Sequence, residues 1–172
     1  VDIATLGALQ VTDVRAGGSS DRNDIRLRAF KVGDGAADMV ITALQSADSD
    51  ASTADRGDIT LEAQGTVTRA NDTAPAILAD VLSVSAYAPI TLNTQVNEAR
   101  LETLTAGDIT LTQGTRAMTL AATRVLDGSL TLAAAGDVQL ADVVLASNRA
   151  SHAVTVTAAG DIGVDRVSAG VY

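Results

Sequence analysis

The sequence predicts an all-β chain folded as a parallel β-helix (β-solenoid) of about seven coils, with corner loops of uneven length. The main observation is a repeated unit: an alternating strand, a few small residues, Gly-Asp and a second alternating strand. It occupies residues 101–111, 130–140 and 154–164, and a shorter copy begins at Gly57. The second observation is that aromatic residues make up only 2% of the chain. Self-similarity at intervals of about 20–50 residues is typical of stacked repeat architectures.

The acidic residues support the same fold class. Nearly all of them are Asp, which favours turns, and few are Glu, which favours helices. A core almost without aromatic residues has to be thin and regular, and Val, Ile and Leu in layers can fill it. These features predict many corners and a narrow coil of strands.

Residues 1–56 contain the less regular strands. Apolar residues there alternate with polar or small ones, which is the pattern of a half-buried strand. The candidate strands are centred on Ile3, on Leu9 with Val11, on residues 25–32 and on residues 39–44. Two polar stretches, 15–24 and 45–56, are rich in turn-forming residues and predict protruding loops.

Residues 57–172 contain the clearest repeats. Ile59 and Leu61 lie on one face of the first clear strand, and Val67 lies on the next. A turn at 71–75 precedes an apolar, strand-like run. Pro89 then stands where other units have Gly-Asp; proline is tolerated at the first residue of a strand.

The unit starts follow one another at unequal distances. They are Gly33, Gly57, Ala88, Gly107, Gly136 and Gly160. Their spacings range from 19 to 31 residues and average about 25. This variation excludes a hexapeptide solenoid and predicts coils with two or three strands each and corner loops of different lengths. Glycine before Asp predicts a bend with positive φ, and Asp is expected to bond the backbone of its own turn.

A single coil cannot bury its apolar face, but coils stacked about 4.8 Å apart can do so. The inward residues are therefore expected to form two aliphatic columns along the stack. The first contains Ile59, Ile90, Ile109, Val138 and Ile162, and the second contains Leu61, Leu92, Leu111, Leu140 and Val164.

A helical reading of residues 99–104 and 116–126 is possible because alanine is abundant. The many Thr, Val and Gly residues and the repeated period-two runs argue against it. All 172 residues are thus expected to form one β-solenoid segment of a larger repeat protein.

Charge and composition exclude several classes of partner. The net charge of −9 argues against nucleic acid, which requires a basic surface. The chain has no cysteine, so it has neither disulfides nor thiolate metal sites. It has no apolar run of about 18 residues, so no helix is expected to span a membrane.

Aligned, the units at 101–111, 130–140 and 154–164 resemble the haemagglutination-activity repeats of filamentous-haemagglutinin-like exoproteins, and the pattern is shared by other giant bacterial β-strand-repeat proteins. The resemblance covers about the last two-thirds of the chain. It implies a right-handed parallel β-helix, exported by bacteria and displayed outside the cell as a long rod. It also implies attachment or surface structure, without catalysis or cofactor.

His152 is the single histidine, and Ser147 and Ser151 lie close to it in the sequence. A catalytic histidine needs a nucleophile and an orienting carboxylate. No such carboxylate can be named from the sequence, which has no G-x-S-x-G motif. His152 is therefore interpreted as a surface residue, and no catalytic residue is predicted.

The Gly-Asp units suggest a row of carboxylates formed by Asp58, Asp108, Asp137 and Asp161. Such a row could serve a β-helical polysaccharide lyase or hydrolase, which is the alternative function. A turn role already accounts for each of these residues, and no basic cluster recurs beside them.

Calcium at the loops is a further alternative, since Ca²⁺ prefers closely spaced oxygen ligands. The candidates are Asp48, Asp50 and Asp55, with Asp21 and Asp24 as a second group. The nine-residue calcium repeat G-G-x-G-x-D is absent, which favours solvated polar loops.

Threonine recurs at outward strand positions, which raises the possibility of an ice-binding array. The residues concerned are Thr60, Thr110, Thr131, Thr155 and Thr157. Asp, Gln and Gly interrupt the array, so ordinary outward strand residues are the preferred interpretation.

These observations predict a structural rod segment of a secreted or cell-surface bacterial protein, and an adhesive role is expected with it. Both ends of the stack would present unpaired strand edges, which neighbouring repeats or copies of the same chain would cover. Loops 17–24 and 45–56 are the expected contact points for host or cell-surface glycans or proteins.

Overall fold

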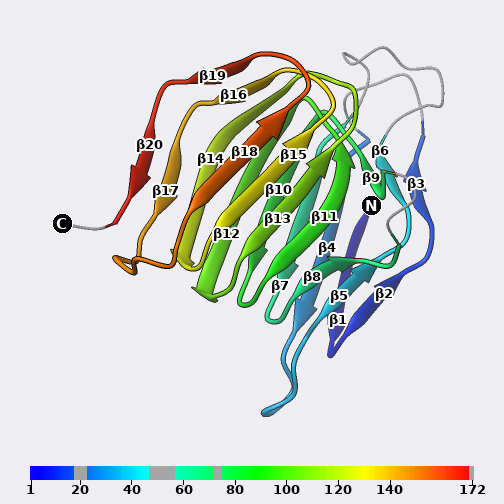
Figure 1. Cartoon of the computed structure of the whole chain (residues 1–172). Coiled ribbons are helices and arrows are strands. Elements are labelled where there is room, and N and C mark those ends of the chain that lie inside the picture. The colour runs from blue at the N-terminus through cyan, green and yellow to red at the C-terminus, as the bar shows by residue number, and fades with distance from the viewer. Residues whose placement is uncertain (18–22, 47–56, 72–74, 171–172) are drawn as a thin grey trace.

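The computed structural model describes residues 1–17, 23–46, 57–71 and 75–170. These residues form strands and turns without a helix, in two long sheets whose strand pairs are all parallel (Figure 1). The chain alternates between the sheets, so each circuit adds one coil to the stack. The predicted all-β parallel β-solenoid is confirmed. Neither 99–104 nor 116–126 is helical, since residues 99–104 and 118–126 lie in strands.

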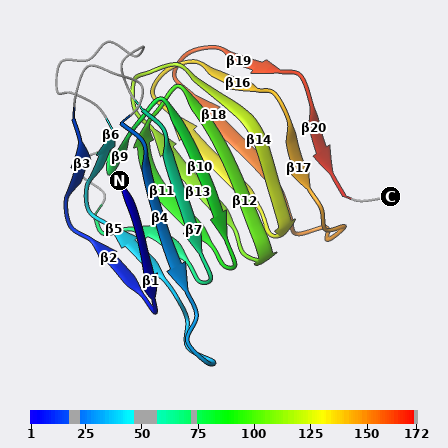
Figure 2. The ribbon, with the colours of Figure 1, turned by 180° about the vertical axis from the view of Figure 1, so that it is seen from behind.

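Sheet A is the sheet at the back of Figure 1 and at the front of Figure 2. Its strands, given in chain order, are β1 (Asp2–Leu6), β4 (Ile25–Phe30), β7 (Ile59–Ala63), β10 (Val81–Ala86), β12 (Glu98–Ala106), β14 (Met118–Asp127), β16 (Val138–Leu140), β17 (Val143–Leu145), β19 (Ile162–Val164) and β20 (Val167–Ala169). In the last two coils a bend divides the long strand of earlier coils into two short ones.

Sheet B faces sheet A across the core. Its strands are β2 (Leu9–Val11), β3 (Val14–Ala16), β5 (Met39–Ile41), β6 (Leu44–Ser46), β8 (Val67–Arg69), β9 (Ile77–Leu78), β11 (Ile90–Gln95), β13 (Ile109–Gln113), β15 (Leu130–Ala134) and β18 (Val154–Ala158). In this sheet the bend divides the strands of the first coils into two short ones. The single strand β11 therefore pairs with both β8 and β9 of the preceding coil.

The inward side chains form aliphatic columns, but their membership differs from the prediction. One column of sheet A contains Ile25, Ile59, Leu82, Ala99, Leu120, Leu140 and Val164. The second contains Ile3, Leu27, Leu61, Val84, Leu101, Thr123, Val143 and Val167. A column of sheet B contains Leu9, Met39, Val67, Ile90, Ile109, Leu130 and Val154. Stacks of seven and eight residues agree with the expected number of coils.

Both predicted columns are therefore wrong, because each combines residues of the two sheets. Ile59 belongs to sheet A and Ile109 to sheet B, although Ile90 does stack on Ile109 and Val138 on Ile162. The cause is that Gly-Asp precedes strands of both sheets. Because both corners of a coil use the same residues, the motif marks a corner without saying which one.

The core between the sheets is aliphatic. Ile, Leu, Val, Met and Ala fill it, with no aromatic residue among the buried core positions that the structure describes. Phe30 is half-buried at a strand end and Tyr87 is exposed. The expectation of a thin core without aromatic residues is confirmed.

The corner glycines are needed for close approach between coils. The predicted positive φ is found at Gly33 and is wrong for Gly57, Gly107, Gly136 and Gly160. Within the described ranges, positive φ occurs only at Gly7, Gly33 and Gly170. A Cβ atom on Gly107 would instead lie 2.6 Å from the backbone nitrogen of Pro89, one coil below. A side chain there would collide with backbone, so glycine is the residue that fits.

The corner aspartates also act between coils and not within their own turns, contrary to the prediction. Asp108 Oδ1 accepts a hydrogen bond of 2.8 Å from the backbone N–H of Ser129, and Asp137 Oδ1 accepts one of 2.9 Å from that of Asp161. Each carboxylate thus satisfies a backbone donor of the next coil. These bonds join the corners of successive coils along the stack axis, in the same direction as the backbone hydrogen bonds between strands.

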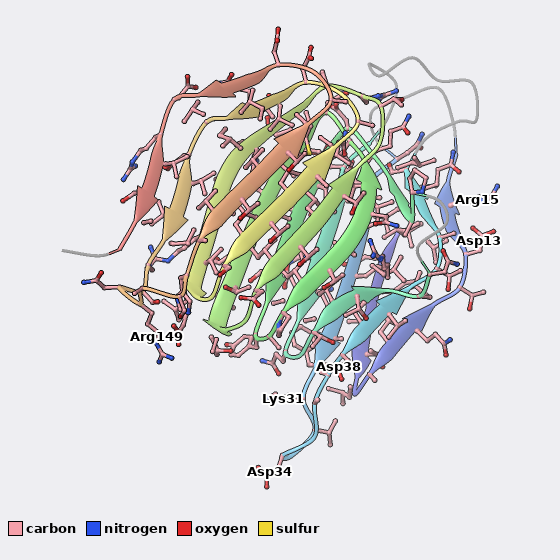
Figure 3. All side chains as sticks on the ribbon, viewed as in Figure 1. Asp13, Arg15, Lys31, Asp34, Asp38 and Arg149 are labelled. Carbon is pink, nitrogen blue, oxygen red and sulfur yellow. The ribbon has the colours of Figure 1, made fainter. Side chains whose placement is uncertain are left out.

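Gly33 does not start a unit. It lies in the loop between β4 and β5, which projects from the stack with Asp34 at its tip (Figure 3). The equivalent of Gly-Asp is Ala37-Asp38, immediately before β5, where Asp38 Oδ1 accepts from the backbone N–H of Thr66. Ala37 is fully buried. The small residue and the carboxylate keep their roles, although the glycine is replaced.

Candidate functional site

Most of the predicted calcium ligands lie outside the part of the chain that the structure describes. Asp21, Asp48, Asp50 and Asp55 lie outside the described residues. Asp24 Oδ1 accepts a hydrogen bond of 3.0 Å from the backbone N–H of Asp58, so it serves a corner. Among the described residues, no group of three or more His, Cys, Asp or Glu side chains is arranged to hold a metal ion.

The predicted row of four carboxylates is divided between two corners, so that expectation is wrong. Asp58, Asp137 and Asp161 precede strands of sheet A, whereas Asp108 precedes a strand of sheet B. Cooperation between a catalytic acid and base needs two carboxyl groups on one face of the substrate site. Asp137 and Asp161 do lie on successive coils of one corner, but Asp137 Oδ1 accepts a hydrogen bond from the backbone N–H of Asp161, which is a structural role.

Asp58 is the corner carboxylate with a perturbed acidity. Partial burial between neighbouring coils raises the pKa of Asp58, and the negative charges of Asp24 and Asp80 raise it further. A hydrogen bond from the backbone N–H of Val81 and the positive charge of Arg100 act in the opposite direction. Proximity to other carboxylates is a direct consequence of stacking one corner on another.

His152 has partners that the sequence did not reveal. Its Nδ1 lies 2.5 Å from Ser147 Oγ, and its Nε2 lies 3.6 Å from Asp127 Oδ1. The side chain is only 15% exposed, so the interpretation as a surface residue is wrong. Arg149, at the outer edge in Figure 3, contacts Asp127 Oδ2 at 3.2 Å. Asp127 precedes His152 by 25 residues, which is one coil.

This cluster resembles a Ser-His-Asp arrangement in composition only. The separation of 3.6 Å between His152 Nε2 and Asp127 Oδ1 exceeds hydrogen-bond length, and Asp127 Oδ1 has no hydrogen-bond partner within the described structure. A general base in such a triad must be oriented by its carboxylate. The geometry instead fits a structural role, in which His152, Ser147 and Asp127 stabilise the corner between β17 and β18.

The outward threonines of sheet B form a continuous column, which corrects the reading of a broken array. The members of this column are Thr68, Thr91, Thr110, Thr131 and Thr155. Thr60 belongs to sheet A, as do Gln139 and Gly163, which appeared to interrupt the array. The interruption came from combining the two sheets.

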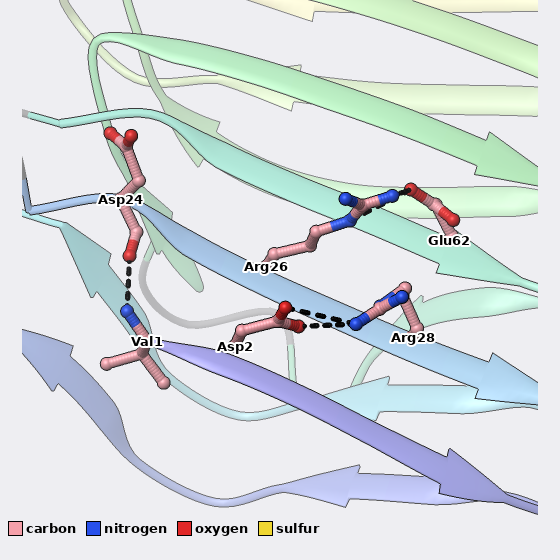
Figure 4. Close-up of polar contacts among 6 residues, drawn as sticks. All are labelled: Val1, Asp2, Asp24, Arg26, Arg28 and Glu62. Atoms are coloured by element: carbon pink, nitrogen blue, oxygen red, sulfur yellow. Dashed lines mark hydrogen bonds and ion pairs between the residues drawn. The ribbon is translucent and has the colours of Figure 1, made fainter.

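The outer face of sheet A carries the charged residues. At the N-terminal end, Arg26 Nη2 donates to Glu62 Oε1 at 2.5 Å, and Arg28 Nη2 donates to Asp2 Oδ1 at 2.9 Å (Figure 4). Each pair joins different coils. These ion pairs are partly exposed, so each is expected to contribute about 1 kcal/mol or less.

Further along the same face is a groove of about 680 Å³. Short side chains from β7, β10 and β14 line part of its floor: Thr60, Ser83, Ser85 and Ala122. Tyr87, Phe30 and Leu104 line it where β10, β4 and β12 approach their ends. The groove therefore combines a hydroxyl-rich floor with an aromatic and aliphatic wall.

Two charged residues in this groove have unpaired side chains. Glu102 and Arg124 are direct neighbours on β12 and β14, and neither side chain has a hydrogen bond or ion pair within the described structure. Arg100, also in the groove, contacts Glu98 at 2.5 Å. Sequence analysis missed this site because its residues come from coils of unequal length.

The chain matches no known family model, no curated protein and no solved structure. In the described part of the chain, no helix is long and apolar enough to cross a membrane.

Proposed function

We propose that the chain is a structural segment of a β-solenoid rod in a large secreted or cell-surface bacterial protein, and that each end of its stack packs against another coil. In preparations of this chain, a second copy would supply that coil in a head-to-tail arrangement. The observation that supports the proposal is the exposure of inward-facing aliphatic residues in both end coils.

At the C-terminal end, Ile162 is 46% exposed and Val164 is 57% exposed. Val138 and Leu140 occupy the same columns one coil below and are 2% and 3% exposed. These side chains occupy inward positions in both coils, but no described coil covers those of the last one. Apolar surface at the end of a core column favours association with a similar surface.

The N-terminal end presents the matching surface. Ile3 is 38% exposed, whereas Leu27, its neighbour in the column, is fully buried. The outermost strands are β1 and β2 at this end and β19 and β18 at the other, in sheets A and B respectively. A second copy could therefore extend both sheets at once, with parallel strands and continuous columns.

Sedimentation velocity over a range of protein concentrations tests this proposal. We expect the chain to form linear oligomers, which electron microscopy would show as rods one solenoid wide. Ile162→Lys with Val164→Lys places two charges on the C-terminal end and is expected to give monomers. Thr155→Lys with Thr157→Lys, on the outer face of the last coil of sheet B, is the matched control and should still assemble.

A chain that stays monomeric at every concentration, or that assembles equally well with the lysine substitutions at 162 and 164, would contradict head-to-tail packing. Circular dichroism of each variant separates loss of assembly from loss of folding.

The secreted or surface location and an adhesive role are part of the same proposal. The resemblance of the repeats to haemagglutination-activity repeats supports both, and the coil corners can present loops to host or cell-surface partners. No catalytic step is assigned, since the corner carboxylates hold the coils together. Incubation with acidic polysaccharides tests this assignment: cleavage that an Asp substitution abolishes would overturn it.

A further inference from the structure

We propose that the groove on the outer face of sheet A binds an uncharged oligosaccharide. This inference gives the adhesive part of the proposed function a defined surface, whereas the rod does not depend on it. The argument uses the size of the groove, its unpaired polar groups, its exposed tyrosine and its balance of charge.

The size of the groove fits a short oligosaccharide. Its volume of about 680 Å³ lies within the range of sites that bind small ligands. The floor crosses β7, β10, β12 and β14, and neighbouring strands lie about 4.8 Å apart. An extended chain of sugar rings running along the stack axis would meet short side chains on β7, β10 and β14 and the charged side chains of β12 between them.

Glu102 and Arg124 provide the polar contacts that a sugar requires. A carboxylate accepts two hydrogen bonds and a guanidinium donates several in a fixed plane, so together they match neighbouring sugar hydroxyls, which donate and accept. Neither side chain is engaged by a described residue. Ser83 and Ser85 add hydroxyl groups to the floor beside them.

Tyr87 provides an aromatic surface for the apolar face of a sugar ring. It is 42% exposed at the wall of the groove. Its backbone is held on both sides, because its N–H donates to Ala63 O at 3.0 Å and its carbonyl accepts from the Thr105 hydroxyl. A large ring on a fixed backbone buries area with a small loss of conformational entropy.

The charge of the groove favours an uncharged ligand. Three carboxylates line it, those of Glu62, Glu102 and Asp142, against the guanidinium groups of Arg100 and Arg124. Only Glu102 and Arg124 remain unpaired, since the other three make ion pairs with residues of the same face. With these pairs and one unpaired charge of each sign, the face is close to neutral, so it offers no excess positive charge to an acidic polysaccharide.

A peptide bound as an added strand is disfavoured for a different reason. β10 pairs with β7 and β12, and β12 pairs with β10 and β14, so the strands that form the floor already have partners on both sides. Strand addition needs an unpaired edge. Side-chain recognition of a hydroxyl-rich ligand does not.

The test uses an array of immobilised neutral oligosaccharides built from glucose, galactose, mannose or N-acetylglucosamine, with polygalacturonate and heparin as acidic probes. We expect binding to at least one neutral class and none to the acidic probes. Tyr87→Ala and Glu102→Gln should each weaken binding at least tenfold. Arg124→Gln should do the same, and Arg15→Gln, which removes a guanidinium in β3 of sheet B, is its matched control.

A spectroscopic measurement makes the test independent of immobilisation. The chain has two tyrosines, and Tyr172→Phe leaves Tyr87 as the only one, in a chain without tryptophan. The neutral oligosaccharide that binds the array should change the fluorescence of Tyr87 in this variant. Circular dichroism must show that each variant is folded.

Several outcomes would overturn the inference: no binding to any neutral class, binding only to the acidic probes, binding that survives Tyr87→Ala and Glu102→Gln, or unchanged Tyr87 fluorescence. Sedimentation of the same variants separates the two proposals. Groove substitutions should leave head-to-tail assembly intact, and the lysine substitutions at 162 and 164 should leave glycan binding intact.

Discussion

Gly107 shows how a single residue permits the coils to stack. Its Cα faces the backbone of the coil below, and a Cβ would lie within 2.6–2.9 Å of Ala88 and Pro89. Gly107→Ala should therefore lower the free energy of unfolding by about 1–3 kcal/mol, because backbone would have to move. Urea unfolding followed by circular dichroism measures this change.

Gly17→Ala is the matched control, since a Cβ there meets nothing within 4 Å and φ is not positive. It should leave the unfolding midpoint nearly unchanged. Equal destabilisation by both substitutions would contradict this expectation, because intrinsic backbone propensity, and not contact between coils, would then explain the loss of stability.

Asp58 links stability to pH. Its raised pKa means that the folded protein binds the proton more tightly than the unfolded chain does. Stability is therefore lost as pH rises from the unfolded pKa, about 4, through the raised folded pKa. Asp58→Asn removes this loss, so the variant should be slightly more stable than the parent at pH 7 and equal to it below about pH 4.

Urea midpoints at pH 7 and at pH 3.5 measure this difference. Asp34→Asn, at the exposed loop tip, controls for the loss of one negative charge. A gain from Asp58→Asn that is the same at both pH values would contradict the expectation.

Gln113 acts at the scale of the element by joining two successive corners of sheet B. Its Nε2 donates to Val96 O at 2.8 Å and its Oε1 accepts from the Thr94 hydroxyl at 2.8 Å, with the side chain only 2% exposed. Gln113→Leu keeps the size but leaves the Val96 carbonyl without this donor and the Thr94 hydroxyl with only a 3.4 Å bond to Thr112 O. We expect a loss of about 1–3 kcal/mol in unfolding free energy.

Gln64→Leu is the matched control for Gln113→Leu. Gln64 follows β7 directly, and its side-chain oxygen accepts one exposed hydrogen bond of 2.8 Å from the Lys31 backbone N–H. It should have a smaller effect on the urea midpoint. An equal effect would mean that burial of the amide is unimportant.

The strands could be predicted from the sequence because alternation is a local property. The run Ile59, Leu61 and Ala63 is buried as its period predicts. Which strand stacks on which is not local, because consecutive coils differ by 17 residues between Leu82 and Ala99 and by 34 between Ile25 and Ile59. The predicted columns failed for this reason.

The groove on sheet A could not be predicted from the sequence, because the pairing of strands from different coils is not a local property. Glu102 and Arg124 become neighbours only when the register of β12 and β14 is known, and that register contains irregularities. The signal for Asp127 was available, since it stands one coil before His152. A spacing of one coil length between Asp127 and His152 predicts that the two side chains lie close together.

The whole molecule is a sum of coils that each contact only their neighbours, as in other repeat proteins. Deleting residues 109–129 removes one coil and brings Leu130 onto Ile90, so each column closes with aliphatic residues. We expect a folded, shorter solenoid with a lower urea midpoint and an unchanged β-type circular dichroism spectrum.

Deleting residues 109–118, about half a coil, is the control. It would place sheet A residues in the position of sheet B and should prevent folding. A folded half-coil deletion, or an unfolded whole-coil deletion, would contradict the description of the molecule as a stack of independent coils.

The backbone hydrogen bonds between coils run along the axis of the stack, and this has a mechanical consequence. A load applied to the two ends pulls on those bonds directly, so the outermost loop of chain should peel away before the interior yields. The circuit from Leu130 to Val154 contains 24 residues, which would lengthen to roughly 80 Å when fully extended. Under tension the rod would behave as a tether that pays out one circuit at a time and rewinds when the force is released.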